Sequence, residues 1–353
     1  MNDENANDLV LMAVGDIMLG SAYFHSLVGK SIPDVLADPT QQLVDDEVMR
    51  TFSEADILFG NLECVISSDF DRNGDGIPPS LMAPDSALSL LETCGFDVLN
   101  LANNHILDHG PEYVEETINH LERSGIEYIG NPLTDQGPIT IDQGELRVQL
   151  VGHYIPDLTS SDHKNRILSD LRSMDEEEGV NIVSLHWGFG GEHMDRPSIH
   201  QVEFGRRLVD EGADVVIGHH SHTLQPVERY EDGIIAYSLG NFIFDQWREQ
   251  NRTGGILQLR IDSDGDITPE ITVTRQDDYV VHTTRESPIG PLIVDDMPTE
   301  PFDEYEKESF RIRTKHKLEV ISQFIRHGHK FPPSYHLSTY KRWSKRAIRE
   351  VRN

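Results

Sequence analysis

A chain of 353 residues with 37% hydrophobic side chains is long enough to bury a globular core, as one large domain or two ordinary ones. Its formal net charge of -31 exceeds what an ordinary substrate or partner requires, and a halophilic-type, high-salt cytoplasm is the simplest explanation. Cys64 and Cys94 are too few for a disulfide framework, so we expect two reduced thiols.

The amino-terminal segment MNDENANDLVLMAVGD is acidic where a signal peptide would carry positive charge. Its apolar run LVLMAV is far shorter than the ~20 residues that a membrane span requires. We therefore expect no signal peptide, no transmembrane segment and a cytoplasmic location.

Short apolar runs bounded by Gly, Asn or His recur along the chain, and they are typical of strands buried on both faces. These runs are DLVLMAV, DILFGN, DVLNLAN, IEYIG, VQLVGH, NIVSLHWG, DVVIGHH and IIAYSLGN. Helix-like segments at 87–93, 111–124 and 200–211 lie between them. The alternation of strands and helices predicts an α/β sandwich.

The pattern changes in the last hundred residues. Two alternating apolar runs around an Asp-Ser-Asp-Gly-Asp turn predict a β-hairpin at about 255–275. We expect one domain over 1–285, an acidic, proline-containing linker over 286–305, and a basic, partly helical tail over 306–353. From position 311 onward the tail holds 12 Lys and Arg against two acids.

Polar side chains follow five of the predicted strands, where each strand ends. Open α/β sheets collect ligands at the carboxyl ends of strands, so the loops are expected to share one crevice. One His after a strand is usually a turn residue, but five loop ends with the same placement favour a site. Nitrogen and oxygen donors without a thiolate favour Mn, Fe or Zn. The loop residues are Asp16; Asn61 and Glu63; Asn103, Asn104, His105 and Asp108; His186, Trp187 and Glu192; and His219, His220 and His222.

The ordered motifs GDIML, GNLE, ANNHxLDxG, HWG, GHHxHxxQ and YSLGNF resemble those of the bacterial capsule-synthesis CapA, or poly-γ-glutamate synthesis, family. That family belongs to the calcineurin-like metallophosphoesterase superfamily. The resemblance covers about residues 9–245. It implies a β-sandwich core flanked by helices, in four layers α/β/β/α, with two divalent metal ions.

Carried over by motif, the resemblance makes six residues metal ligands: Asp16, Glu63, Asn104, His186, His220 and His222. His105 would be the general acid or the electrostatic partner of the phosphate. Asn61, Asn103, Trp187, His219 and Asn241 are expected to surround the ligands, although a plain packing role is favoured for Trp187.

The sequence departs from the superfamily pattern at two positions. Met18 stands where the first motif, Asp-x-His, has its His, and Glu63 stands where phosphoesterases have a bridging Asp. The CapA family itself shows both features.

Asp108 has two interpretations of equal weight. It lies three residues after His105, where it could fix the His tautomer and support acid–base catalysis. It could instead cap a helix that begins at Pro111.

Two further segments attract attention. The stretch 69–76, DFDRNGDG, matches the opening of a calcium loop, but Ser80 stands where the final Glu belongs, and an acidic surface loop explains it as well. The basic tail, with Lys341, Arg342 and Trp343, suits a peripheral membrane contact or docking on the acidic body. Nucleic acid is disfavoured, because the acidic body would repel it.

These observations predict a metal-dependent hydrolase with a phosphoesterase-type site, linked to the biosynthesis of a capsular or cell-surface polymer. Its substrate would be an anionic polymer, poly-γ-glutamate or polysaccharide, or a phosphoester. The alternative is a metal-binding component of a polymer synthesis or export assembly that does not hydrolyse. A nuclease is disfavoured by the acidic body and by Met18.

Overall fold

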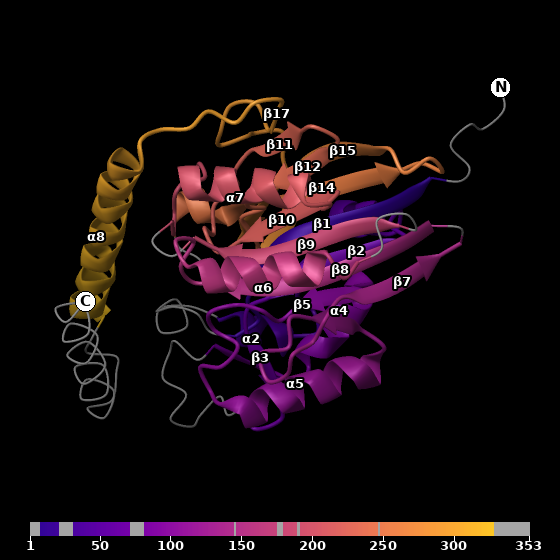
Figure 1. The fold of residues 1–353 in the computed structure, drawn as a ribbon. Helices are drawn as coiled ribbons and strands as arrows, with labels where there is room; N and C mark the ends of the chain where they lie inside the picture. Colours follow the sequence, from indigo (N-terminus) through magenta and orange to yellow (C-terminus); the bar gives the residue numbers. More distant parts are fainter. Residues whose placement is uncertain are drawn as a thin grey trace.

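Two β-sheets lie face to face, and helices cover the outer side of each (Figure 1). The computed structural model of the chain describes residues 8–20, 31–70, 81–144, 146–174, 179–188, 191–245 and 248–327. The four-layer α/β/β/α architecture predicted from the sequence is confirmed.

The first sheet has β1 near its centre and mixes parallel and antiparallel neighbours. A short strand, β13 (Asn241–Ile243), pairs with the carboxyl end of β1. The other strands, in spatial order, are β16 (Val280–Thr283), β15 (Ile267–Asp277), β14 (Thr253–Ile261), β1 (Leu9–Ile17), β2 (Ile57–Leu62), β5 (Val98–Asn100) and β6 (Glu127–Ile129).

The second sheet is parallel at its centre, where β8, β9, β10 and β12 lie side by side. Its strands, in spatial order, are β17 (Ile293–Val294), β11 (Val227–Tyr230), β12 (Gly233–Ala236), β10 (Val215–His219), β9 (Val180–Trp187), β8 (Leu146–Ile155) and β7 (Ile139–Gln143). A separate pair consists of β3 (Val65–Ser67) and β4 (Met82–Pro84).

Helices bury one apolar stripe each against the sheets. The first sheet is covered by α2 (Ile32–Leu36), α3 (Asp46–Phe52), α4 (Ala87–Cys94) and α5 (Pro111–Ser124). The second is covered by α6 (Ser161–Leu171) and α7 (Ile199–Asp210). Proline at the first turn of α5 and left-handed Gly125 after its last turn set the ends of that helix.

The inter-sheet core follows the two-residue alternation of a β-strand. Leu11 of β1, Phe59 of β2 and Ile217 of β10 point between the sheets, while Met12 and Val216 point to the outer layers. Full burial of each such side chain stabilises the fold by roughly 1.5–3 kcal/mol.

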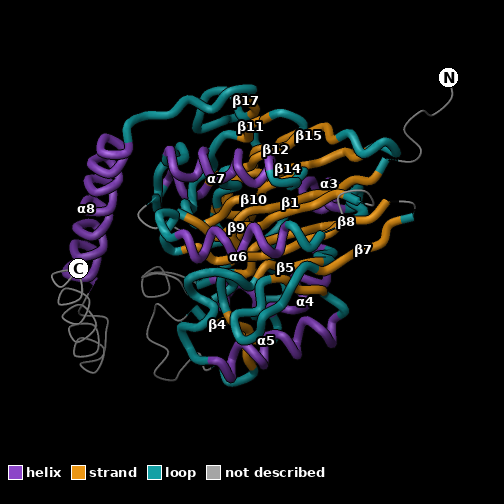
Figure 2. The backbone as a smooth tube through the Cα atoms, viewed as in Figure 1, coloured by secondary structure: helices purple, strands orange, loops and turns teal. Residues whose placement is uncertain are grey.

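The last part of the described chain adds strands to both sheets and ends in a helix. β14 and β15 form an antiparallel hairpin where the alternating sequence predicts one. Residues 286–305, expected as a linker, contain β17, which pairs with β11, and the first turn of α8 (Phe302–His327). Figure 2 shows α8 at one end of the sandwich.

Several predictions concern residues that the structure does not describe. The calcium-like loop lies mostly outside the described residues, as does the tail from 328 onward. Among the described helices, none is both long enough and apolar enough to cross a membrane.

Candidate metal centre

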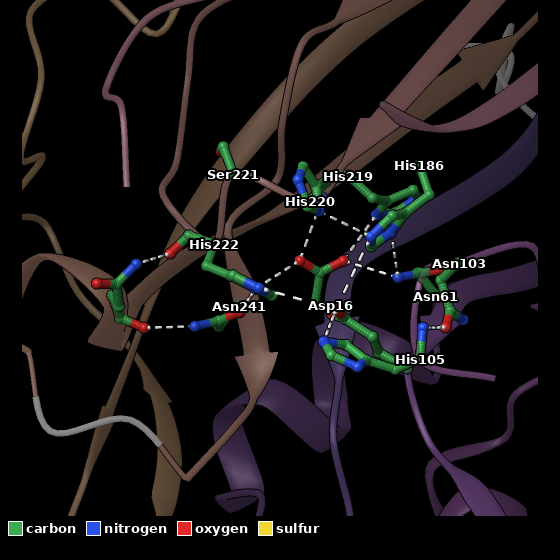
Figure 3. Close-up of polar contacts among 12 residues, drawn as sticks. Asp16, Asn61, Asn103, His105, His186, His219, His220, Ser221, His222 and Asn241 are labelled. Carbon is green, nitrogen blue, oxygen red and sulfur yellow. Dashed lines mark hydrogen bonds and ion pairs between the residues drawn. The ribbon is translucent and has the colours of Figure 1, made fainter. Parts of the chain in front are cut away.

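Polar residues occupy the last inward-facing position of several strands at one end of the sandwich. In the first sheet, the register pairs Asp16 with Asn61, and Asn61 with Asn100. In the second sheet, His219 pairs with His186. The apolar inter-sheet core therefore ends in two facing polar rows (Figure 3).

An irregularity in β1 turns Asp16 toward the opposite sheet. Leu11 and Ala13 face between the sheets, so strict alternation would send Asp16 to the outer side. The register with β2 shifts between Ala13 and Asp16, which moves the alternation by one residue. Gly15 permits the shift, because a Cβ there would lie 2.0 Å from the carbonyl oxygen of Gly240.

The Asp16 carboxylate is fully buried and well partnered. Oδ1 accepts a hydrogen bond from Asn61 Nδ2 at 2.8 Å, and Oδ2 lies 3.0 Å from His222 Nδ1. His219 Nδ1 lies 3.4 Å from Oδ1. Burial alone would raise the pKa of Asp16, but His219 and His222 outweigh it and hold that pKa well below its usual value.

Glu63 is also fully buried, yet neither of its carboxylate oxygens accepts a hydrogen bond from any described residue. Three imidazole nitrogens surround Oε1: Nε2 of His186 and of His222 at 3.8 Å each, and Nε2 of His105 at 3.9 Å. Burial raises the pKa of Glu63 to about 8. A buried carboxylate in this state is costly unless a cation compensates it.

The imidazoles divide into two electrostatic groups. Burial lowers the pKa of His220 to about 4 and that of His186 well below its usual value. At His222, burial is outweighed by Glu63 and Asp16, and the pKa rises to about 10. A neutral imidazole nitrogen can bind a metal ion, whereas protonated His222 must lose its proton before it can bind one.

Hydrogen bonds fix the orientation of these rings. His220 Nδ1 lies 3.0 Å from His186 Nε2, and His186 Nδ1 lies 3.3 Å from Asn61 Nδ2. His222 Nδ1 lies 3.0 Å from Asn241 Oδ1 (Figure 3). The surrounding amides thus hold the rings that face the carboxylates, as is typical of metal centres.

Three of the six non-glycine residues with positive φ among the described residues lie at or beside the centre. His220 and His222 adopt positive φ angles of 91° and 56°, and His193 beside them adopts 68°. Such conformations in non-glycine residues cost of order 1–3 kcal/mol each and persist where the surroundings impose them. The surroundings that impose these backbone conformations also set the directions of the His220 and His222 side chains.

The donors fit a divalent cation. Ligand atoms of Asp16, Glu63 and His186 all lie within 4.8 Å of one another. Two bonds of about 2.0–2.2 Å to oxygen and nitrogen donors span up to about 4.4 Å, close to this upper limit. The unpartnered carboxylate of Glu63 and the buried, unpartnered Oδ1 of Asn104 are oxygens that a cation would satisfy among the described residues.

The rim of the centre carries an imidazole–carboxylate pair. His105 Nδ1 lies 2.7 Å from Asp108 Oδ2, and the side chains are 31% and 46% exposed. Asn103 Oδ1 accepts the backbone N–H of His105, which fixes the turn. The helix-cap alternative for Asp108 is wrong, because the N-cap of α5 is Gly110 and no side chain caps it.

Two sequence-selected residues lie away from the centre. Trp187 is buried in the outer apolar core under α7, where its Nε1 donates to the Tyr237 carbonyl at 3.1 Å. This corrects its assignment to the surroundings of the ligands, because the residue after inward-facing His186 points outward. Met18 lies in the other outer core, among apolar side chains.

Three residues of the site were missed from the sequence. Asn100 donates to Asn61 Oδ1 at 3.0 Å, and Asn251 accepts from Asn241 Nδ2 through its backbone carbonyl at 2.9 Å. His193 is buried, with its ring centroid 6.3 Å from that of His222. Strand alternation identifies Asn100, two residues after inward-facing Val98; no local pattern identifies the other two.

A two-sheet sandwich with buried carboxylates and imidazoles at its strand ends defines a protein with a candidate centre for divalent metal. The model of the bacterial capsule synthesis protein family, PGA_cap, matches residues 10–246. The chain belongs to this family, as the motifs predict.

Two curated relatives agree with the family match. Capsule biosynthesis protein CapA of Bacillus anthracis is 27% identical over 277 residues, which is 73% of this chain and 65% of that protein. PGA biosynthesis protein CapA of Bacillus subtilis is 27% identical over 283 residues, 75% of this chain and 72% of that protein. The chain spans about two thirds of the length of these relatives.

Solved structures show a weaker likeness. A putative 5'-nucleotidase from Staphylococcus aureus has a TM-score of 0.46 at 15% identity, covering 86% of this chain and 58% of that one. The sulfate thiohydrolase SoxB of Thermus thermophilus has a TM-score of 0.43 at 14% identity, covering 77% and 57%.

Proposed function

We propose that the chain is a divalent-metal-dependent hydrolase that cleaves a phosphoester or related bond in the metabolism of an anionic cell-surface polymer. One observation carries the proposal: the fully buried Glu63 carboxylate accepts no hydrogen bond from the described residues and faces three imidazole nitrogens at 3.8–3.9 Å. A carboxylate in such surroundings is built for a cation.

The ligands would be Asp16, Glu63, Asn104, His186, His220 and His222, with one or two ions of Mn, Fe or Zn. A bound divalent ion supplies Lewis acidity and lowers the pKa of water that it binds. Asn61 and Asn241 orient the rings of His186 and His222.

Proton transfer is assigned to His105. Asp108 accepts a hydrogen bond from Nδ1 of His105, and Nε2 on the other side of the ring faces Glu63 and the centre. The Asp108 hydrogen bond and the charge of Glu63 outweigh burial and raise the pKa of His105, which favours an imidazolium that donates a proton to a leaving oxygen at Nε2. Partial exposure of both side chains lets the proton be replenished from solvent.

The polymer context rests on the relatives, whose names place them in capsule and PGA biosynthesis. Cations bound at the centre, together with His105, would suit an anionic oxygen group on the substrate.

The test measures metal content and hydrolysis in the same samples. Full-length protein is loaded with Mn, Fe or Zn, its metal content is determined by elemental analysis, and rates are recorded on p-nitrophenyl phosphate, its diester and γ-linked polyglutamate. We expect one or two ions per chain, metal-dependent turnover, and loss of both in Glu63→Gln. His282→Gln is the matched control, because that half-exposed ring contacts Asp277 outside the centre. Wild-type metal content in Glu63→Gln, or an inert metal-loaded protein, would overturn the proposal.

A second candidate function is a metal-binding component of a polymer synthesis or export assembly that does not hydrolyse. The observation in its favour is Met18, which lies in the apolar core where the superfamily pattern has a His ligand. Stoichiometric metal without turnover on any of the three substrates would select this function.

A further inference from the structure

A cavity of about 530 Å³ lies between α8 and the loops that follow β8 and β9 of the second sheet. Its wall is formed by the loop after β8, the loop after β9, the first turn of α7 and the inner face of α8. Pro156, Gly191, Ser198, Tyr305 and Arg313 represent these four segments.

Two hydrogen-bond donors in this wall lack a partner among the described residues. Tyr305 is 4% exposed, and its hydroxyl has no hydrogen bond. The Nε of Arg313, two turns further along α8, is buried and also without a partner. Unsatisfied buried donors cost free energy, so in a native protein they call for a ligand or water.

The chemistry of the wall selects an oxyanion. A guanidinium and a hydroxyl hydrogen-bond to carboxylate or phosphate oxygens, and the positive end of the α7 dipole at Ser198 adds to their effect. Asp157 and Glu306 also line the cavity, but both are exposed at its rim, where solvent screens their charges.

The loop after β9 connects the cavity to the metal centre. On one side, a Cβ on Gly191 would lie 3.0 Å from the Tyr305 hydroxyl oxygen. On the other side, the His193 N–H donates to the Ser221 carbonyl at 2.7 Å, between His220 and His222. The cavity and the metal centre therefore lie on the two sides of this one loop.

We propose that Arg313 and Tyr305 form a subsite for an anionic oxygen group of the substrate, a carboxylate or a phosphate remote from the bond that is cleaved. The proposal rests on the proposed function for the identity of the ligand as substrate. Because α8 lies beyond residues 10–246, the subsite is an addition of this chain to the part that the family model matches.

Binding is measured without turnover, so that the result does not depend on hydrolysis. Full-length, metal-depleted protein is titrated calorimetrically with γ-linked triglutamate, with inorganic phosphate, and with γ-linked tri-isoglutamine, in which an amide replaces each carboxylate. The variants are Arg313→Gln, Arg313→Lys and Tyr305→Phe. Arg311→Gln is the control, since that side chain is exposed on the same helix. Circular dichroism and Tm verify that each variant is folded.

We expect Arg313→Gln to weaken binding of the anion about tenfold or more, Tyr305→Phe to weaken it about fivefold, and Arg313→Lys to restore part of it. Arg311→Gln should stay within about twofold. Preference for triglutamate identifies a carboxylate subsite, and preference for phosphate a phosphate subsite.

The subsite is excluded if tri-isoglutamine binds as well as triglutamate and phosphate does not bind. It is also excluded if Arg313→Gln and Arg311→Gln behave alike. Metal-dependent turnover that survives these results would leave the proposed function standing, whereas a metal-loaded protein that binds the anion through Arg313 but never turns over would refute only the hydrolase.

Discussion

The metal centre has a buried wall, formed by Asp16, Glu63 and His186, and an exposed rim, formed by His105 and Asp108, and the two parts are built differently. Asp16, Glu63 and His186 are fully buried, while the His105 and Asp108 side chains are 31% and 46% exposed. Low-dielectric surroundings strengthen the attraction between carboxylates and a cation, whereas a proton donor must exchange with water. From this difference we expect the proposed cation binding and the proposed proton transfer to be lost separately on mutation.

The largest effect is expected in the wall. Asp16→Asn removes the charge that faces His219 and His222. Metal affinity should fall more than about 100-fold, since mutation of residues that only hydrogen-bond to metal ligands already lowers it about 10–100-fold. Activity should fall to background. Elemental analysis after dialysis against a weak chelator measures the loss, and unchanged metal content would show that Asp16 is no ligand.

At the rim, His105→Asn should lower kcat by about 100- to 10,000-fold while metal content stays at the wild-type level. The physical reason is that Asn cannot donate a proton from the Nε2 position, although the loop turn held by Asn103 remains. Parallel elemental analysis and steady-state rates make the measurement. Loss of metal in this variant would place His105 in the wall instead.

Asp108→Asn should have a smaller effect, about 10- to 100-fold on kcat. Asp108 raises the pKa of His105 through a hydrogen bond, so its removal should move the alkaline limb of the pH–rate profile to lower pH. A purely structural role would lower the rate without moving the profile.

The affinity of the wall for metal should increase with pH. In metal-depleted protein, burial raises the pKa of Glu63 to about 8, above the usual 4.5. Below about 8 a cation must displace this proton and the one on His222, whose pKa is about 10, so Kd should tighten by up to about 100-fold per pH unit between pH 6 and 8. By the same sign, the stability of metal-depleted protein that depends on this proton is present below pH 4.5 and lost as pH rises through 8. Titrations at several pH values measure the slope, and Glu63→Gln should reduce it to about tenfold per pH unit, because the His222 proton still has to leave.

Strand ends are the part of the site that the sequence predicts well. Asp16, Asn61, His186 and His219 follow apolar runs, and parallel strands bring such ends to one edge of a sandwich. The family motifs then separate the proposed ligands from their neighbours. The fold follows from the same runs, because each run forms a strand and is bounded by Gly, Asn or His.

What the sequence hides comes from three-dimensional packing. Asp16 faces inward only because β1 is irregular next to Gly15, which depends on close contact with Gly240. His193 reaches the centre through a loop. In the cavity, Tyr305 and Arg313 of α8 lie more than a hundred residues along the chain from the lining residues of α7 and of the loops after β8 and β9. No local pattern encodes such long-range contacts.

Substitution of Trp187 should have the smallest effect on function, and it tests where the buried wall of the metal centre ends along β9. It follows His186 directly, yet its ring stacks on Tyr237 in the outer core, with centroids 6.1 Å apart and planes 13° apart. Trp187→Phe removes buried volume and the hydrogen bond to the Tyr237 carbonyl, so the free energy of unfolding should fall by about 1–3 kcal/mol.

Metal content and activity of Trp187→Phe should remain within about twofold of wild type at temperatures where the protein is folded. His186→Gln should behave in the opposite way, losing metal because its Nε2 faces Glu63. Chemical denaturation and elemental analysis on both variants make the comparison. If Trp187→Phe also lost metal, the boundary of the wall would extend through β9 to its outer face, and strand alternation would no longer separate ligand from core.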